Sequence, residues 1–189
     1  ANCAGLRYRV DGFNTTLNLI SFGIASSGSG KGAILASMQE AMRTVGVNAA
    51  VYGGIKSEQE MYRNLLRHQA NYYMIDEVGS LLSKIGNSSK SKASYLEGVV
   101  ATTISVFSAA NGYVAVNGDT KEKLHETLGI EMARLVKRTD AGEQGLEGKI
   151  EELKKQMSSI NDGIENPYLS LCGVAEPGRF YEAINADEW

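Results

Sequence analysis

The chain has 189 residues, of which 43% are hydrophobic, and a formal net charge of −3. This predicts one globular domain with a sizeable core, and the weak negative charge argues against a protein that coats nucleic acid by bulk electrostatics. No apolar run reaches membrane-spanning length, and the start shows no signal-peptide pattern. Cys3 and Cys172 have no metal-ligand spacing, so we expect reduced thiols and a cytoplasmic protein, in a bacterial host if the chain is phage-encoded. Because the chain begins with Ala1 rather than methionine, we expect a piece of a longer protein.

Strand and helix patterns alternate through the first 80 residues. Residues 30–45 carry apolar side chains at helical spacing, and Gly46 ends the pattern. Ser57 stands three residues before Glu60, a capping-box spacing that begins the next helix. Strands are expected at 6–10, 17–25, 48–52 and 72–75, with 17–25 apolar enough for a buried strand.

The second half of the chain is mostly helical in its pattern. Helices are expected at 93–110, at 120–138 with Asp119 or Thr120 as the cap, and at 149–160. Strand character returns only at 167–174. We therefore predict a single α/β domain over 1–189, with a parallel sheet wrapped by helices. Its core strands lie within 17–79 and 167–176, and a helical insertion spans about 80–166.

The segment after the predicted strand 17–25 is typical of a phosphate-binding loop. It reads Ala25-Ser-Ser-Gly-Ser-Gly-Lys31, which is alanine, four residues, then glycine and lysine. Glycines let backbone N–H groups surround a phosphate, the helix that follows offers its positive end, and lysine reaches the outer phosphates. The residues expected to hold a nucleotide are Ala25, Ser26, Ser27, Gly28, Ser29, Gly30, Lys31, Gly32 and Ala33.

Gly32 stands where nucleotide sites usually have a serine or threonine that binds Mg²⁺. Glycine has no hydroxyl, so the metal would need other support. The candidates are water, Asp76 and a nearby serine such as Ser29.

An acidic pair, Asp76-Glu77, directly follows the apolar strand 72–75. Ligands bind at the carboxyl ends of strands in open α/β sheets, so this position is typical of a site. We expect Asp76 to hold Mg²⁺, directly or through water, and Glu77 to polarise the attacking water. With Lys31, these are the predicted catalytic residues.

Together these motifs resemble the P-loop, RecA-like ATPase domain of phage and prophage primase–helicase proteins, a group often described only as of unknown function. The resemblance covers most of the chain and implies ATP-driven movement on single-stranded DNA, as a replicative helicase that works as a ring. In this group a glycine after the lysine is tolerated, whereas hydroxyl residues tend to stand where this chain has Ala175-Glu176. The matching segments are 26–32, 57–66, 74–79 and 167–183.

Other residues are candidates for coupling ATP to DNA. Lys84, Lys90 and Lys92 lie in a segment without acidic residues that could contact a nucleic-acid backbone or be an ordinary solvated loop. Ser170 could sense the γ-phosphate from its strand, or be a buried, hydrogen-bonded serine. Candidates for an arginine finger are Arg134, Arg138 and Arg179. For Arg134 and Arg138, the preference for basic residues near a helix C-terminus is the slightly favoured explanation.

Two further functions compete with a DNA motor. A small-molecule kinase would share the phosphate loop, but an adjacent Asp-Glu pair favours hydrolysis over transfer, and no arginine-rich lid follows. A nucleotide-binding regulatory or assembly module, with weak or no hydrolysis, is supported by Gly32.

Overall fold

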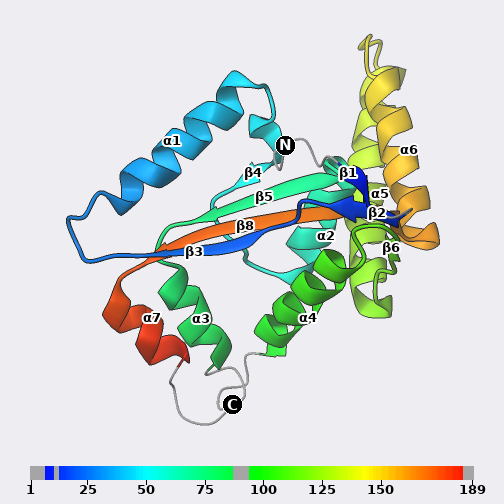
Figure 1. Cartoon of the computed structure of the whole chain (residues 1–189). Coiled ribbons are helices and arrows are strands. Elements are labelled where there is room, and N and C mark those ends of the chain that lie inside the picture. The colour runs from blue at the N-terminus through cyan, green and yellow to red at the C-terminus, as the bar shows by residue number, and fades with distance from the viewer. Residues whose placement is uncertain (1–6, 11–12, 87–93, 185–189) are drawn as a thin grey trace.

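A computed structural model describes residues 7–10, 13–86 and 94–184, and its centre is a four-stranded parallel sheet (Figure 1). The strands lie side by side in the order β3 (Ile20–Ile24), β8 (Tyr168–Ala175), β5 (Ala70–Ile75) and β4 (Val51–Tyr52). In the register of the sheet, Ile24 of β3 lies opposite Ala175 of β8, and Ile75 of β5 lies opposite Gly173 of β8. The predicted α/β class with a parallel sheet is confirmed, and the last strand of the chain lies between the first and third strands of the predicted core.

Helices cover the two faces of the sheet unequally. Helix α1 (Lys31–Thr44) lies on one face, whereas α2 (Glu58–Arg67), α3 (Val78–Gly86), α4 (Ser94–Ser108) and α7 (Pro177–Ile184) lie on the other (Figure 1). Two long helices, α5 (Gly118–Asp140) and α6 (Glu147–Asp162), pack on each other beyond the end of the sheet that is remote from the start of α1.

Strands β5 and β8 are buried on both faces, which explains their continuous apolar sequences. On β5, Tyr72 and Met74 join the core beneath α1, whereas Tyr73 and Ile75 join the larger core beneath the other helices. Strand β8 alternates in the same way, with Val174 on the α1 side and Leu171 on the other.

Strand β3 differs from its prediction as a buried strand. It lies at one end of the sheet order, and no described strand pairs with its second edge. Consequently Ile20, Phe22 and Ile24 are exposed, and the Phe22 ring contacts that of Phe180 on α7, with 5.7 Å between the ring centroids. An apolar run does not distinguish a central strand from an edge strand, because that position depends on which other strands pair with it.

Several predicted boundaries move by a few residues. The segment expected as strand 48–52 is a 3₁₀ turn, η2 (Asn48–Ala50), followed by the short strand β4. The cap of α5 is Asn117, not Asp119 or Thr120, because the Asn117 side chain accepts a hydrogen bond from the Thr120 N–H. Ser57 caps α2 as predicted, accepting from the Glu60 N–H at 3.1 Å.

Two small antiparallel ladders contain three strands that the sequence did not predict. The predicted strand 6–10 is β1 (Arg7–Val10), but it pairs with an unpredicted partner, β2 (Phe13–Thr16), in an antiparallel ladder. Within the insertion, β6 (Tyr113–Val114) pairs with β7 (Ile164–Glu165). Two-residue strands carry too little periodicity to be recognised in a sequence, since only their pairing defines them.

Two glycines allow α3 and α7 to approach the sheet and each other. A Cβ on Gly173 of β8 would lie 2.7 Å from the Cβ of Val78, and one on Gly79 would lie 3.3 Å from the Arg179 backbone. The first residue of α3 therefore rests directly on the β8 backbone. This close packing places the turns after β5 and β8 next to each other.

Candidate nucleotide site

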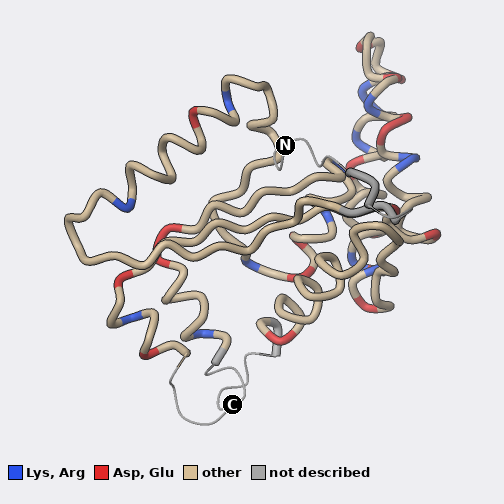
Figure 2. Tube along the Cα trace, in the orientation of Figure 1, with Lys and Arg blue, Asp and Glu red and all other residues tan. Residues whose placement is uncertain are grey.

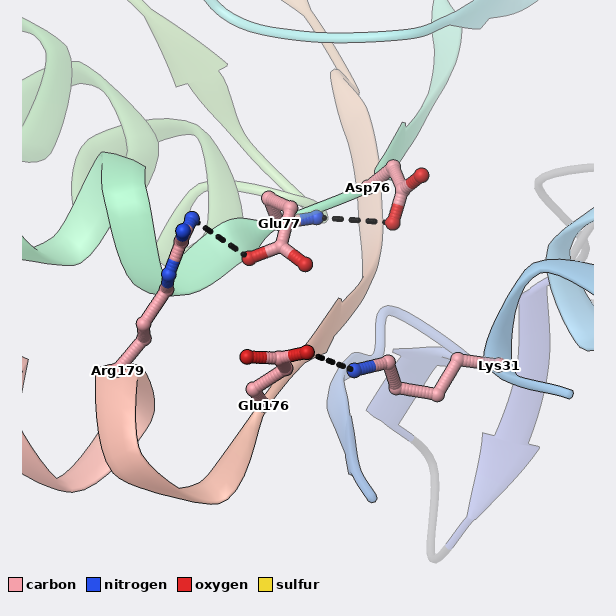
Figure 3. Close-up of polar contacts among 5 residues, drawn as sticks. All are labelled: Lys31, Asp76, Glu77, Glu176 and Arg179. Atoms are coloured by element: carbon pink, nitrogen blue, oxygen red, sulfur yellow. Dashed lines mark hydrogen bonds and ion pairs between the residues drawn. The ribbon is translucent and has the colours of Figure 1, made fainter. Parts of the chain in front are cut away.

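The carboxyl edge of the sheet gathers charged side chains from three separate segments of the chain. Lys31 follows strand β3, Asp76 and Glu77 follow β5, and Glu176 and Arg179 follow β8 (Figure 3). The helix after β3 lies on one face of the sheet and the helix after β8 lies on the other. In open α/β sheets, ligands usually bind outside the carboxyl ends of adjacent strands whose connections diverge in this way.

The loop between β3 and α1 bends at two glycines with left-handed backbone conformations. Gly28 and Gly30 adopt φ angles of 78° and 84°, which are left-handed values that glycine tolerates best. A hydrogen bond from Ala25 N–H to Ala175 C=O ties the start of the loop to the end of β8. Residues Ser26 to Gly30 are exposed, so a ligand can reach the loop.

Helix α1 begins without a side-chain cap. Its N-cap is Gly30, no side chain bonds to the cap, and no acidic residue lies in the first turn. The first N–H groups of any helix have no partner within the helix, and their combined dipole favours a negative ligand. The start of α1 thus offers an anion both hydrogen-bond donors and a favourable field.

Lys31 is the least satisfied charged group of the site. Only 11% of its side chain is exposed, its Nζ is buried, and no described acceptor lies within hydrogen-bonding distance of that atom. Its charge partner is Glu176, whose Oε1 lies 3.9 Å away. A buried ammonium normally carries hydrogen bonds as well as a counter-charge, since desolvation is otherwise uncompensated.

The acidic pair lies where the sequence predicts it, at the end of β5. Asp76 is exposed, and its Oδ1 accepts a hydrogen bond from the Glu77 N–H at 3.0 Å. Glu77 has φ = 57°, a left-handed conformation that is uncommon for a residue with a side chain. Such conformations cost free energy and concentrate at functional sites.

Arg179 lies beside the acidic pair of its own chain. Its Nη1 donates to Glu77 Oε2 at 3.4 Å, and both side chains are partly exposed. Of the three predicted arginine-finger candidates, Arg179 alone contacts a predicted catalytic residue within this chain. This contact orients the Glu77 carboxylate toward α7.

Magnesium would depend on a small number of protein ligands here. In the described part of the chain, no three His, Cys, Asp or Glu side chains come together as a metal cluster. Mg²⁺ commonly binds one or two carboxylates together with substrate phosphates and water, and exposed Asp76 fits that role. Ser29 is also exposed at the loop, whereas Gly32 offers no side-chain ligand.

Ser170 lies away from this cluster, and its hydroxyl is hydrogen-bonded within the sheet. It is buried, it accepts from the Leu19 N–H at 3.1 Å, and it bonds to the Tyr168 hydroxyl at 3.2 Å. Its partner in the ladder is Tyr72, three pairs before the end of β5. Of the two interpretations of Ser170, a buried, hydrogen-bonded serine agrees with this position.

The remaining candidates do not meet the cluster within one chain. Arg134 and Arg138 lie on α5, at the opposite end of the molecule from the start of α1 (Figure 1). Arg138 Nε donates to Glu143 at 2.7 Å, and this contact holds the pKa of the Glu143 carboxyl below its usual value. Lys84 is exposed near the end of α3. Lys90 and Lys92 lie outside the described residues.

The two long helices carry charged positions of both signs. Basic and acidic positions are interspersed along α5 and α6 (Figure 2). On α6, one stripe of apolar side chains packs into the larger core beneath the other helices; it consists of Ile150, Leu153, Met157 and Ile160.

Glu176 is a charged residue of this cluster for which the sequence predicted no role. The signal was available, because Glu176 directly follows a predicted strand in the same way as Asp76 follows β5. What the sequence lacks is the strand order, which places β8 beside β3 and thus Glu176 beside Lys31.

The chain matches no protein-family model, no curated protein and no solved structure in the comparisons made. Among the described helices, none combines the length and the apolar character needed to cross a membrane.

Proposed function

We propose that the chain binds ATP with Mg²⁺ at the β3–α1 loop and hydrolyses it. The observation that carries the proposal is the buried Lys31 ammonium, which lacks a hydrogen-bond acceptor beside an uncapped helix start and a glycine-bent loop. A phosphate would supply the missing acceptor and would accept from the loop N–H groups as well.

The residues around the loop have separate roles in this proposal. Lys31 pairs with the outer phosphates, and Asp76 holds Mg²⁺, which when bound neutralises charge on the phosphates. Glu77 orients a water molecule toward the terminal phosphorus and accepts its proton. Because Glu77 contacts Arg179, this role requires the carboxylate to turn away from α7.

We further propose that ATP turnover serves movement on single-stranded DNA, as a helicase or translocase that assembles into a ring. This part depends on the resemblance of the phosphate loop, the acidic pair and the segment 167–183 to phage primase–helicase ATPase domains. Its direct test is ATP hydrolysis measured with and without single-stranded DNA, together with mass photometry of the assembly. Turnover that DNA does not stimulate would contradict the motor function while leaving the ATPase intact.

The site is tested by two substitutions and one control. Lys31→Ala should abolish ATP binding in a calorimetric titration, whereas the exposed Lys56→Ala should bind as the parent does. Glu77→Gln should retain binding and lose turnover by about 100-fold or more, the size of a general-base contribution. Normal hydrolysis by Glu77→Gln would refute the role of Glu77.

A nucleotide-binding regulatory module is the second candidate. It is favoured by Gly32 and by the contact that holds Glu77 toward Arg179. In that case the folded parent protein would bind ATP through Lys31 without measurable turnover, with or without DNA. Turnover that depends on Glu77 would exclude this candidate.

A further inference from the structure

Glu176 is held firmly at the point where β8 passes into α7. The preceding residue, Ala175, accepts a hydrogen bond from the Ala25 N–H of the loop at 3.2 Å. The Glu176 C=O accepts from the Phe180 N–H at 2.9 Å, so the backbone of Glu176 forms part of the first turn of α7. The backbone of Glu176 is thereby tied to the β3–α1 loop through Ala175 on one side and to α7 on the other.

The Glu176 carboxylate and a bound phosphate would compete for the same cation. Glu176 Oε1 lies 3.9 Å from Lys31 Nζ, which is within ion-pair range but too long for a hydrogen bond (Figure 3). A phosphate oxygen that hydrogen-bonds to Lys31 would gain a stronger, charge-assisted interaction. A carboxylate left close to that phosphate would repel it.

We infer that Glu176 is an affinity-determining residue of the nucleotide site: it neutralises Lys31 while no phosphate is bound, and it opposes the binding of phosphate. This inference rests on the proposed function, since it takes Lys31 as the phosphate-binding cation. It assigns the acidic residue after β8 an electrostatic effect on affinity, separate from the metal and water roles of Asp76 and Glu77.

The test compares Glu176→Gln with a matched loss of charge elsewhere on α7. Glu182→Gln removes an exposed carboxylate from the same helix without touching the Lys31 contact. Calorimetric titrations with Mg·ATP, and separately with inorganic pyrophosphate, would be made on both variants and the parent. Glu176→Gln should tighten binding about threefold to fivefold, as expected for a partly exposed ion pair, and Glu182→Gln less than about twofold.

A double-mutant cycle shows whether the effect passes through Lys31. In a Lys31→Ala background, pyrophosphate binding should be weak, and Glu176→Gln should tighten it by a smaller factor than in the parent, because only the repulsion between Glu176 and the phosphate remains. If Glu176→Gln does not fold, which thermal unfolding would reveal, Glu176→Asp replaces it. The shorter arm retracts the carboxylate from Lys31, so this variant should also bind more tightly than the parent.

The outcomes separate this inference from the proposed function. If the parent binds ATP through Lys31 but the Glu176 variants bind equally or more weakly, the inference about Glu176 is overturned and the nucleotide site stands. If the folded parent and all variants bind neither ATP nor pyrophosphate, the proposed function fails, and the inference fails with it.

Discussion

The contact between Gly173 and Val78 allows a test of how the fold positions Glu77. A Cβ added at position 173 would lie 2.7 Å from Val78 Cβ and 2.8 Å from each of its two γ-carbons. Non-bonded carbons prefer a separation of about 3.5–4.0 Å, so Val78 would have to retreat by roughly 0.8 Å. Both residues lie in or directly against the main core, where there is little room for such a shift.

Gly173→Ala should therefore destabilise the protein by about 2 kcal/mol, within the usual range of about 1–3 kcal/mol for overpacking. For a domain of this size, that change corresponds to a decrease in melting temperature of about 4–8 °C. Because Val78 is covalently next to Glu77, its displacement should also move the predicted base. In the folded variant we expect ATP hydrolysis to fall more than ATP binding.

The matched control is Gly129→Ala in α5. A Cβ there meets nothing within 4 Å, and Gly129 lies inside a helix remote from the site. This variant should be more stable than the parent by about 1 kcal/mol, the difference in helix propensity. Both free energies of unfolding would be measured by urea denaturation. The close packing of α3 on β8 is refuted if the free energy of unfolding of Gly173→Ala lies within about 0.5 kcal/mol of the parent's, which is roughly the scatter among surface substitutions.

Three further substitutions address the loop and the helix ends. The loop has room for Gly32→Ser, since nothing lies within 4 Å of a Cβ built at that position. The serine hydroxyl should tighten ATP binding measured in Mg²⁺ but not in EDTA. An equal increase in affinity under both conditions would contradict a metal-binding role. Ser57→Ala removes the side chain that accepts from the Glu60 N–H, so the free energy of unfolding in urea should fall by about 1 kcal/mol. An unchanged denaturation midpoint would show that the cap does not contribute to stability. Arg138→Ala breaks an exposed ion pair with Glu143, so the free energy of unfolding should change by less than about 1 kcal/mol. ATP turnover should persist. Loss of turnover at concentrations where the protein assembles would instead identify Arg138 as an arginine finger.

Local sequence chemistry was sufficient for much of this fold. Apolar periodicity located the core strands 72–75 and 167–174, because buried strands of parallel sheets are apolar on both faces. The capping serine Ser57 and the glycine-bent loop before Lys31 were recognisable because their signals lie within a few residues. The same holds for the acidic pair, whose position after a strand places it at the carboxyl edge of the sheet.

Long-range pairing decided the remainder. The run at 17–25 was expected to be buried, yet β3 is an edge strand, because edge or centre depends on partners distant in the sequence. For the same reason the contact of Lys31 with Glu176 was not foreseen, since it exists only because β8 lies between β3 and β5. The sequence alone therefore identified the residues that we propose bind phosphate, since they lie in one short loop and the helix that follows it. Which carboxylates face that loop was decided by the strand order, because side chains from separate segments meet only when the sheet assembles.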